Sequence, residues 1–382
     1  MRSDVRVGVT TIFFVTASIM AAACDSGGSS GDDGDDQPPP GVAYQRVDLA
    51  SDEAGAADRL DADLVNAWGI AAGPDTAFWI ADEGTEMTSI LDGDGAQVLP
   101  GIGLGGEVTG TVYNPTLGFP LLTPNQISAP AVFVFATTSG NLIGWSDKAL
   151  PAAGVLAYDG TGTLAAYTGL AIADDRNGGM RLYAANFASG SVDVFDDQFR
   201  LMDTAGAFID PDLPADYVPF GIQEVDGLIY VTYALRDEDE PDEEVRGPGL
   251  GIVNAFSIDG VLDRRVMTGG ELNAPWAIAR APSSFGDFGG DLLIGNFGDG
   301  RITALASNDR VEGQLSEGGQ PIAIDGLWGM MFGNDRNAGS SNALYFAAGP
   351  ADEMHGLFGR IQLASRVDDP GDIGGGGGGT HY

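Results

Sequence analysis

Residues 272–305 read LNAPWAIARAPSSFGDFGGDLLIGNFGDGRITAL and hold one complete copy of a unit that recurs along this chain. The copy contains three apolar segments, at 276–281, 291–296 and 301–305, and the last of them alternates between polar and apolar residues. Short apolar segments bounded by glycine-rich turns are typical of β-strands. A unit of three strands cannot bury its faces alone, so the sequence predicts that neighbouring copies stack against one another.

The unit occurs six times, and a small residue in its first strand marks each copy. The first strands read NAWGIA, VTGTVY, YTGLAI, PFGIQE, PWAIAR and LWGMMF, and their markers are Gly69, Gly110, Gly169, Gly221, Ala277 and Gly329. Second strands are expected at 78–82, 131–136, 181–186, 228–234, 291–296 and 343–347, and third strands at 87–91, 141–145, 191–195, 251–257, 301–305 and 356–363. The markers lie 41 to 59 residues apart, which is close to the length of a four-stranded propeller blade. Residues 42–367 are therefore predicted to form one all-β domain, a six-bladed β-propeller, because the main alternative of two β-sandwiches does not explain six markers in register.

The sixth copy has no fourth strand of its own, since the chain becomes glycine-rich soon after residue 367. Residues 44–49, YQRVDL, precede the first copy and alternate as an edge strand does. Pairing this segment with the last blade closes the ring and removes exposed strand edges. We therefore expect an N-terminal strand in the sixth blade.

The charge of the chain limits its partners. The sequence has 55 acidic and 18 basic residues among 382, a formal net charge of -37. Such a surface repels phosphate backbones and anionic lipids, so we expect no nucleic-acid partner and no direct membrane binding. We also expect a monomer. The chain has two acidic runs, at 25–36 and 237–244. The simplest interpretation is that they are solvated segments, and the alternative is that they bind cations.

The first 23 residues have the features of an export signal. Arg2 and Arg6 precede an apolar run at 7–23, which ends in small residues directly before Cys24, the only cysteine. The segment resembles a bacterial lipoprotein signal, which implies that Cys24 is lipidated and that the protein lies in the cell envelope. Such signals usually have leucine where this chain has Ala21, and cleavage after Ala23 to give a secreted protein is the alternative.

Both ends of the chain are poor in apolar side chains. Residues 24–41 are acidic, glycine-rich and proline-rich, and residues 368–382 contain six consecutive glycines. Neither segment can support a core, so we expect a disordered tether and a disordered tail. The lipid on Cys24 would be the one membrane attachment, because nothing after residue 24 is long and apolar enough to span a bilayer.

Several repeats resemble known propellers. GIA at 69–71 and LYAANFASGSVDVF from Leu182 resemble NHL-type repeats, in which a second strand ends in Asp or Asn before a turn. The segments LNAPWAIA, FGGDLLIGNFGDGRITAL, IDGLWGMMFGN and HGLFGRI look like an uncharacterised family of secreted bacterial propellers, some of which carry a PEP-CTERM sorting tail. The resemblance covers about residues 44–363 and implies an NHL-like six-bladed fold without an established activity. This chain lacks that tail, so the lipoprotein-type signal would replace the anchor.

Polar residues gather on the loops that enter first strands and leave second strands, which share one face of a propeller. These residues are Asn66, Asn273 and Asp325 before first strands, Asp82, Asn186 and Asn296 at the ends of second strands, and Glu353 and His355 in the last loop. The acidic insert at 236–249 belongs to the same set of loops and is expected to rise over that face. Oxygen ligands suit Ca²⁺, so Asn66, Asp82, Asn186, Asn273 and Asn296 are candidate metal ligands. The alternative is that these side chains close turns by bonding to nearby backbone groups.

A catalytic role is the second hypothesis. Gluconolactonase-like enzymes are six-bladed propellers with a channel calcium and an Asp base, and the comparison rests on fold alone. Asp325 is the best-placed base and His355 a second candidate catalytic residue, although Asn66 stands where that calcium site has a Glu. A single histidine cannot build a multi-histidine zinc site, and no GxSxG motif is present. A turn role for Asp325 and a loop role for His355 are the alternatives.

Trp68, Trp276 and Trp328 occupy equivalent positions in three first strands, and they could stack on a sugar or pack in the core between blades. No complete catalytic constellation is visible in the sequence. We therefore predict an exported binding or interaction module whose ligand is a small molecule, a carbohydrate or a protein. The alternative is a calcium-dependent hydrolase that acts on a lactone or another ester.

Overall fold

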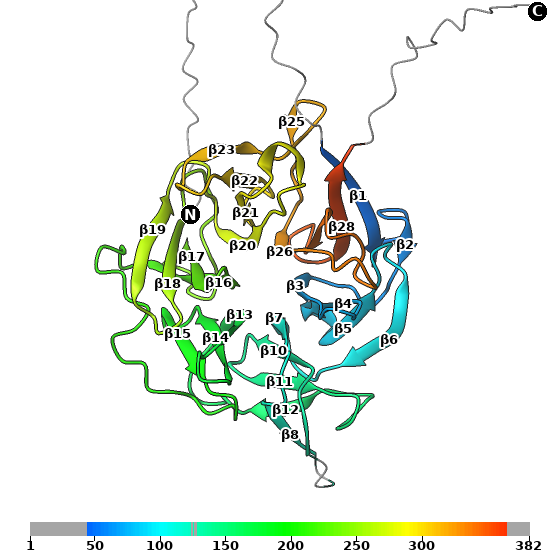
Figure 1. The fold of residues 1–382 in the computed structure, drawn as a ribbon, viewed down its shortest axis with the longest axis vertical. Coiled ribbons are helices and arrows are strands. Elements are labelled where there is room, and N and C mark those ends of the chain that lie inside the picture. Colours follow the sequence, from blue (N-terminus) through cyan, green and yellow to red (C-terminus); the bar gives the residue numbers. More distant parts are fainter. Residues whose placement is uncertain (1–43, 124, 126–127, 365–382) are drawn as a thin grey trace, which may run out of the picture. The chain divides into compact units, whose positions relative to one another are not determined.

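The computed structural model describes residues 44–123, 125 and 128–364, whose strands form a closed ring of six blades (Figure 1). The predicted β-propeller is therefore confirmed. Within these residues helix is limited to two 3-10 turns, η1 (Glu83–Thr85) and η2 (Gly286–Phe288), and no helix is long or apolar enough to cross a membrane. The predicted signal, the tether, Cys24 and the glycine-rich tail lie outside the described residues.

The first three blades follow one another along the chain. Blade 1 contains β3 (Ala67–Ala71), β4 (Phe78–Asp82), β5 (Met87–Leu91) and β6 (Gln97–Gly103). Blade 2 contains β7 (Val108–Tyr113), β10 (Phe133–Thr137), β11 (Leu142–Trp145) and β12 (Val155–Tyr158), and the hairpin of β8 (Pro120–Leu122) and β9 (Ser128–Pro130) projects from it. Blade 3 has three strands, β13 (Tyr167–Asp174), β14 (Met180–Asn186) and β15 (Ser191–Phe195), and a single bridge between Phe195 and Leu201 stands at the fourth position.

The other three blades complete the ring. Blade 4 contains β16 (Tyr217–Val225), β17 (Leu228–Leu235), β18 (Ile252–Ser257) and β19 (Leu262–Thr268). Blade 5 contains β20 (Pro275–Arg280), β21 (Leu292–Asn296), β22 (Ile302–Leu305) and β23 (Val311–Gln314), and the short pair β24 (Ser316–Glu317) and β25 (Gln320–Pro321) follows it. Blade 6 contains β26 (Leu327–Phe332), β27 (Leu344–Ala348), β28 (Leu357–Leu363), β1 (Tyr44–Ser51) and the two-residue strand β2 (Arg59–Leu60).

The ring closes through the N-terminal strand, as the sequence predicts. β1 pairs antiparallel with β28, from Tyr44 opposite Leu363 to Ser51 opposite Leu357. The Tyr44 hydroxyl donates a hydrogen bond of 2.9 Å to the carbonyl of Phe285, so β1 is also tied to blade 5. The edge of β28 is thus covered, which removes a row of unpaired backbone groups.

The marker glycines lie where neighbouring first strands approach most closely. A Cβ atom on Gly110 would lie 2.2 Å from the amide nitrogen of Leu170, and one on Gly221 would lie 2.1 Å from the carbonyl oxygen of Trp276. Both atoms belong to the backbone of the next blade, so neither can move aside without distorting a strand. A small residue recurs in the sequence because the six first strands converge on one axis and leave no room for a larger side chain.

Each blade has a register irregularity at its marker. In all six blades the pairing between first and second strand skips at this point, as between Pro275 and Ala277 in blade 5. A bulge re-aims the side chain at the irregular position. The residues immediately before the markers form a layer across the centre, which we call the central layer and which consists of Trp68, Thr109, Thr168, Phe220, Trp276 and Trp328.

The hydrophobic core lies between blades. Trp79 of β4 packs against Phe133 of β10 and Trp145 of β11, with ring centroids 4.4 Å apart in both pairs. The second strands are buried on both faces, which explains why their sequences are continuous apolar runs rather than alternating ones. β10 begins at residue 133 rather than 131 because Ala131 donates its N–H to the carbonyl of Phe119, outside the blade.

Candidate functional site

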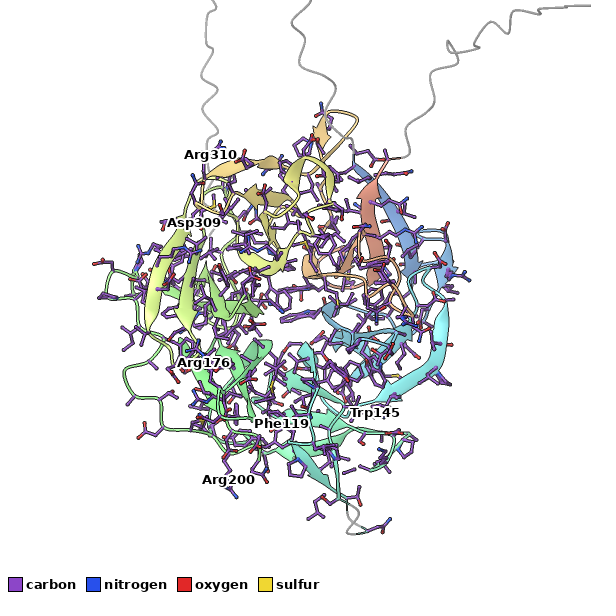
Figure 2. All side chains as sticks on the ribbon, in the orientation of Figure 1. Phe119, Trp145, Arg176, Arg200, Asp309 and Arg310 are labelled. Atoms are coloured by element: carbon purple, nitrogen blue, oxygen red, sulfur yellow. The ribbon has the colours of Figure 1, made fainter. Side chains whose placement is uncertain are left out.

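A pocket of about 470 Å³ opens on the axis of the propeller, on the face that holds the loops before first strands and after second strands. Its apolar floor comes from Trp68, Phe220 and Trp328 of the central layer together with Phe187. Its walls carry six carboxylates, which are Glu83, Glu107, Asp242, Glu243, Glu244 and Glu353. Figure 2 shows side chains filling the middle of the ring, whereas the exposed Arg200 and Arg310 lie at its outer edge.

The tryptophans of the central layer pack against one another across the axis. Trp328 is sandwiched between Trp68 and Phe297, with a ring-centroid distance of 3.8 Å on each side, and only 1% of it is exposed. Trp276 meets Trp328 edge-on at 5.9 Å. Core packing, one of the two roles considered for these residues, therefore fits their surroundings. The same layer also closes the bottom of the pocket.

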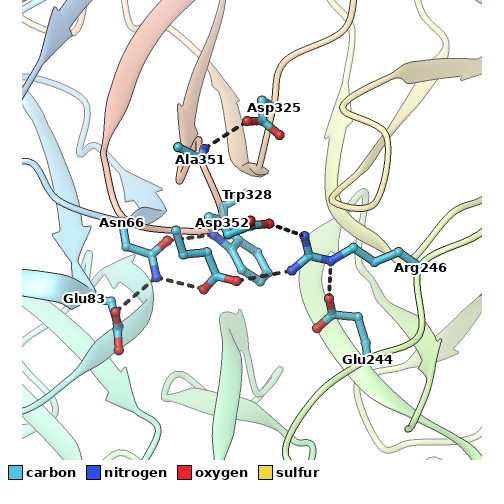
Figure 3. Close-up of polar contacts among 9 residues, drawn as sticks. Asn66, Glu83, Glu244, Arg246, Asp325, Trp328, Ala351 and Asp352 are labelled. Atoms are coloured by element: carbon cyan, nitrogen blue, oxygen red, sulfur yellow. Dashed lines mark hydrogen bonds and ion pairs between the residues drawn. The ribbon is translucent and has the colours of Figure 1, made fainter. Parts of the chain in front are cut away.

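Asn66 is the polar residue that joins the floor to the walls. Its Nδ2 donates to Oε2 of Glu83 and to Oε2 of Glu353, both at 3.0 Å, while its Oδ1 accepts from Nε1 of Trp328 at 3.1 Å (Figure 3). An indole nitrogen can only donate, which fixes the orientation of the amide. Asn66 is buried with φ of 47°, a conformation that asparagine adopts more readily than most residues. Asn66 thus presents N–H groups, and not its oxygen, to the two carboxylates.

The acidic insert supplies one basic group to this site. Nε of Arg246 lies 2.9 Å from Oε1 of Glu244, and an Nη of Arg246 lies 3.4 Å from Oε1 of Glu353 (Figure 3). The guanidinium carbon also lies 4.3 Å from the centroid of the Phe297 ring, which is within the range of a cation–π contact. Arg246 therefore holds a positive charge between an aromatic ring and two carboxylates.

Burial and mutual repulsion disfavour the charged forms of these carboxylates. Burial raises the pKa of Glu353 to about 7; the bond from Asn66 and the charge of Arg246 oppose the rise, and Glu244 adds to it. Burial likewise raises the pKa of Glu83 and the pKa of Glu244, whose side chain is 6% exposed. Within the described chain no basic side chain pairs with Glu83, Glu107, Asp242 or Glu243. The pocket is therefore strongly negative, and a positively charged ligand would stabilise its ionised carboxylates.

Three of the predicted metal ligands form hydrogen bonds with other parts of the protein. Asn186 accepts from the amides of Ala166 and Ser189 at 3.2 Å, and Asn273 accepts from the amide of Gly247 at 2.7 Å. Asn296 donates to the carbonyl of Glu271 at 2.7 Å and to Asp299 at 3.0 Å. The bond from Gly247 makes Asn273 an anchor for the acidic insert.

Asp82 lies between blades 1 and 6 and not in the pocket. It is fully buried, and neither of its carboxyl oxygens has a hydrogen-bond partner among the described residues, although Ser89 lies beside it. Burial raises the pKa of Asp82 well above its usual range. This environment therefore favours the neutral form of the Asp82 carboxyl group.

The two candidate catalytic residues lie apart from each other. Asp325 is exposed, and its Oδ2 accepts from the amide of Ala351 at 2.9 Å (Figure 3). Nδ1 of His355 lies 2.9 Å from Oδ2 of Asp52, and that carboxylate raises the pKa of His355. Neither residue lines the pocket; Asp325 bonds to backbone as a turn residue does, whereas the imidazole of His355 bonds to a carboxylate.

The hydrogen bonds of the predicted ligands bear on the calcium hypothesis. The side-chain oxygens of Asn66, Asn186 and Asn273 each accept a hydrogen bond from the protein. Across residues 44–123, 125 and 128–364, no three carboxylate, histidine or cysteine side chains are grouped closely enough to hold a metal ion. These hydrogen bonds do not test calcium binding directly, so calcium binding stays a prediction.

The pocket also uses residues that the sequence did not single out. Glu83 directly follows the candidate Asp82, and Glu107 precedes a first strand, so both belong to the loop set that was considered. The run of acidic residues in the insert is the sequence feature that points to Glu244 as a pocket residue. Residues 238–243 are exposed as the composition suggests, whereas the side chain of Glu244 is only 6% exposed.

The fold and the site together define a six-bladed β-propeller with an acidic pocket on its axis. The chain is 31% identical over 326 residues to the uncharacterized protein R648 of Acanthamoeba polyphaga mimivirus, covering 82% of this chain and 78% of that protein. It is 30% identical over 318 residues to the uncharacterized protein L690 of the same virus, covering 80% and 82%. The chain belongs to the family of these two proteins. No protein-family model matches it.

One solved structure with a TM-score above 0.5 supports the fold. A protein of unknown function from Bacteroides thetaiotaomicron has a TM-score of 0.53 and 12% identity, covering 84% of this chain and 76% of that one. Virginiamycin B lyase from Staphylococcus aureus has a TM-score of 0.46 and 14% identity, covering 84% and 99%. These likenesses concern architecture and carry no function to this chain.

Proposed function

We propose that this protein is an exported, lipid-anchored binding module that takes its ligand in the central pocket. The observation that supports this proposal is the combination of an aromatic floor with carboxylate walls in a cavity of about 470 Å³. Ligand sites are typically concave, largely apolar and a few hundred Å³ in volume, with a small number of polar groups that orient the ligand. Export and the lipid on Cys24 rest on the N-terminal sequence.

The arrangement of loops supports a binding role. Residues from blades 1, 2, 3, 4 and 6 and from the acidic insert meet at one opening. The insert is held in place by Asn273 and by a backbone bond of 2.7 Å from Val245 to Leu235. A pocket built on such rigid supports loses little conformational freedom when a ligand binds.

A hydrolytic function has less support. Asp325 is exposed and occupied with a backbone amide, and His355 is paired with Asp52, so neither is directed at the pocket. We therefore do not propose lactone or ester hydrolysis, which stays an alternative for the calcium experiment in the Discussion.

A thermal-shift screen with and without a blocked pocket tests the proposal. Ser139 is exposed and lines the pocket, so Ser139→Trp narrows the cavity without burying a new group in the core, and Ser139→Ala is its matched control. Compounds that raise the melting temperature of the wild type and of Ser139→Ala should have no effect on Ser139→Trp. Equal stabilisation of all three proteins, or no stabilisation by any compound in a chemically diverse library, would contradict a binding function at this pocket.

A further inference from the structure

The chemistry of the central pocket narrows the class of ligand, and this inference rests on the proposed binding function. Six carboxylates line the pocket and no basic side chain does. Within the described chain Arg246 is the one basic residue paired with any of them, and it contacts Glu244 and Glu353 only from the side of the insert. Anionic ligands would be repelled from this site, and a neutral ligand would leave its charge uncompensated.

We infer that the central pocket recognises an organic ammonium compound whose positive group pairs with Glu83 and Glu353 and whose apolar body lies on Trp68 and Phe220.

The contacts of Asn66 favour an ammonium group over a guanidinium group. Asn66 occupies Oε2 of Glu83 and Oε2 of Glu353, and Arg246 lies 3.4 Å from Oε1 of Glu353, so a ligand would find Oε1 of Glu83 and the remaining lone pairs of the Glu353 oxygens. A guanidinium fork binds best when both oxygens of one carboxylate are free, whereas an ammonium group directs three separate donors to single oxygens. Separate single acceptor positions on two carboxylates match the second geometry.

The floor favours an organic cation over a metal ion. The nearest side-chain amide, Asn66, turns its N–H groups and not its oxygen toward Glu83 and Glu353, and no metal-binding group of three acidic, histidine or cysteine side chains occurs in the described chain. A hydrated metal ion gains nothing from the aromatic floor, whereas burial of an alkyl body on it contributes about 25 cal/mol per Å². Arg246 already shows this chemistry inside the protein, with its charge on two carboxylates and its plane over Phe297.

Binding should also depend on pH. The charged and polar groups that face Glu353 are Asn66, Glu243, Glu244, Asp352 and Arg246, and together with burial they leave its pKa at about 7. An ammonium group pairs with the ionised form, so its affinity should fall about tenfold between pH 8 and pH 6, over which the ionised fraction falls by that factor.

The experiment measures binding of hexylammonium, hexanol and hexanoate to the full chain at pH 8 by calorimetry. Hexylammonium should bind at least about tenfold more tightly than the other two, a factor that corresponds to 1.4 kcal/mol. Glu83→Gln and Glu353→Gln should each weaken hexylammonium binding by about tenfold. Glu238→Gln, an exposed residue of the same insert outside this pocket, should leave it unchanged. Glu83 has no ion pair in the described chain, so its variant keeps the test informative if loss of the contact between Glu353 and Arg246 impairs folding.

The outcomes separate the inference from the proposed function. If hexanol or hexanoate binds as tightly as hexylammonium and Ser139→Trp prevents it, the pocket binds ligands and the ammonium class is wrong. If hexylammonium binding survives Ser139→Trp, the site is elsewhere and the inference fails. If none of the three binds, the inference also fails, and the library screen decides the proposed function independently. Comparing the affinity for Nα-acetyl-lysine amide with that for hexylammonium shows whether the pocket prefers a lysine side chain or a free amine. Tighter binding of either compound supports the ammonium class.

Discussion

Replacing Glu353 by glutamine should change how the stability of the propeller depends on pH. Glu353 is a carboxyl group with a side chain 29% exposed, and burial raises its pKa from the usual 4.5 to about 7. Between pH 4.5 and about 7, Glu353 is therefore protonated in the folded state and ionised in the unfolded state. Folding is favoured by low pH at this group, and the free energy of unfolding decreases as pH rises from about 4.5 to about 7.

The magnitude follows from the size of the change in pKa. A tenfold change in proton affinity corresponds to about 1.4 kcal/mol, so raising the pKa from 4.5 to about 7 makes ionised Glu353 cost at most ~3 kcal/mol relative to its neutral form. Glutamine has the shape of the neutral form and does not titrate. The free energy of unfolding of Glu353→Gln, minus that of the wild type, should therefore rise by up to ~3 kcal/mol between pH 4.5 and pH 8.

Urea denaturation of both proteins at half-unit intervals of pH measures this difference. Any constant offset from the lost contact with Arg246 does not affect the prediction, because only the trend with pH is compared. Glu107→Gln removes an exposed carboxylate from the same pocket and controls for the loss of one negative charge. A difference that stays flat from pH 4.5 to pH 8, or that falls as pH rises, would refute the raised pKa of Glu353 and the burial that causes it.

Four further predictions test the fold, the calcium hypothesis and the cellular location. Gly110→Ala should destabilise the protein by about 1–3 kcal/mol, because its Cβ would lie 2.2 Å from the amide nitrogen of Leu170, whereas Gly103→Ala has open space and should change the melting temperature little. Deleting residues 44–51 should lower the melting temperature sharply because it uncovers the edge of β28, and an unchanged value would contradict closure by β1. Calcium titration of metal-stripped protein should leave the melting temperature unchanged if the hydrolase alternative is wrong; a large rise, together with loss of ester turnover in Asp325→Ala, would restore that alternative. Cys24→Ala should release the protein from membrane fractions, and its retention there would disprove lipid anchoring.

The repeats made the architecture predictable because the same physical demand acts at six places. Every first strand needs a small residue where it meets the next, as the approach of Gly110 to Leu170 shows. Such a demand leaves a periodic trace in the sequence. Blade 3 departs from the pattern because its fourth position is reduced to the bridge between Phe195 and Leu201, which local composition did not signal.

The pocket was less predictable because its residues are brought together by ring geometry. Asn66 and Glu353 are separated by 287 positions, and their contact depends on the closure of blade 6 beside blade 1. Asn66 and Asn186 occupy equivalent kinds of loop, yet one joins two carboxylates at the axis and the other caps a turn. The sequence predicts the face of the propeller on which these loops and the pocket lie, but the choice between these roles depends on contacts between blades.

The pairing of Tyr44 with Leu363 has a consequence for chain connectivity. Facing partners in an antiparallel ladder have Cα atoms about 5 Å apart, so a short peptide could join the two ends of the propeller. New termini could then be opened in an exposed loop between two blades, and every blade would keep its strands. A circular permutant of this kind should fold to the same ring, because the order in which the blades are synthesised is independent of the order in which they surround the axis.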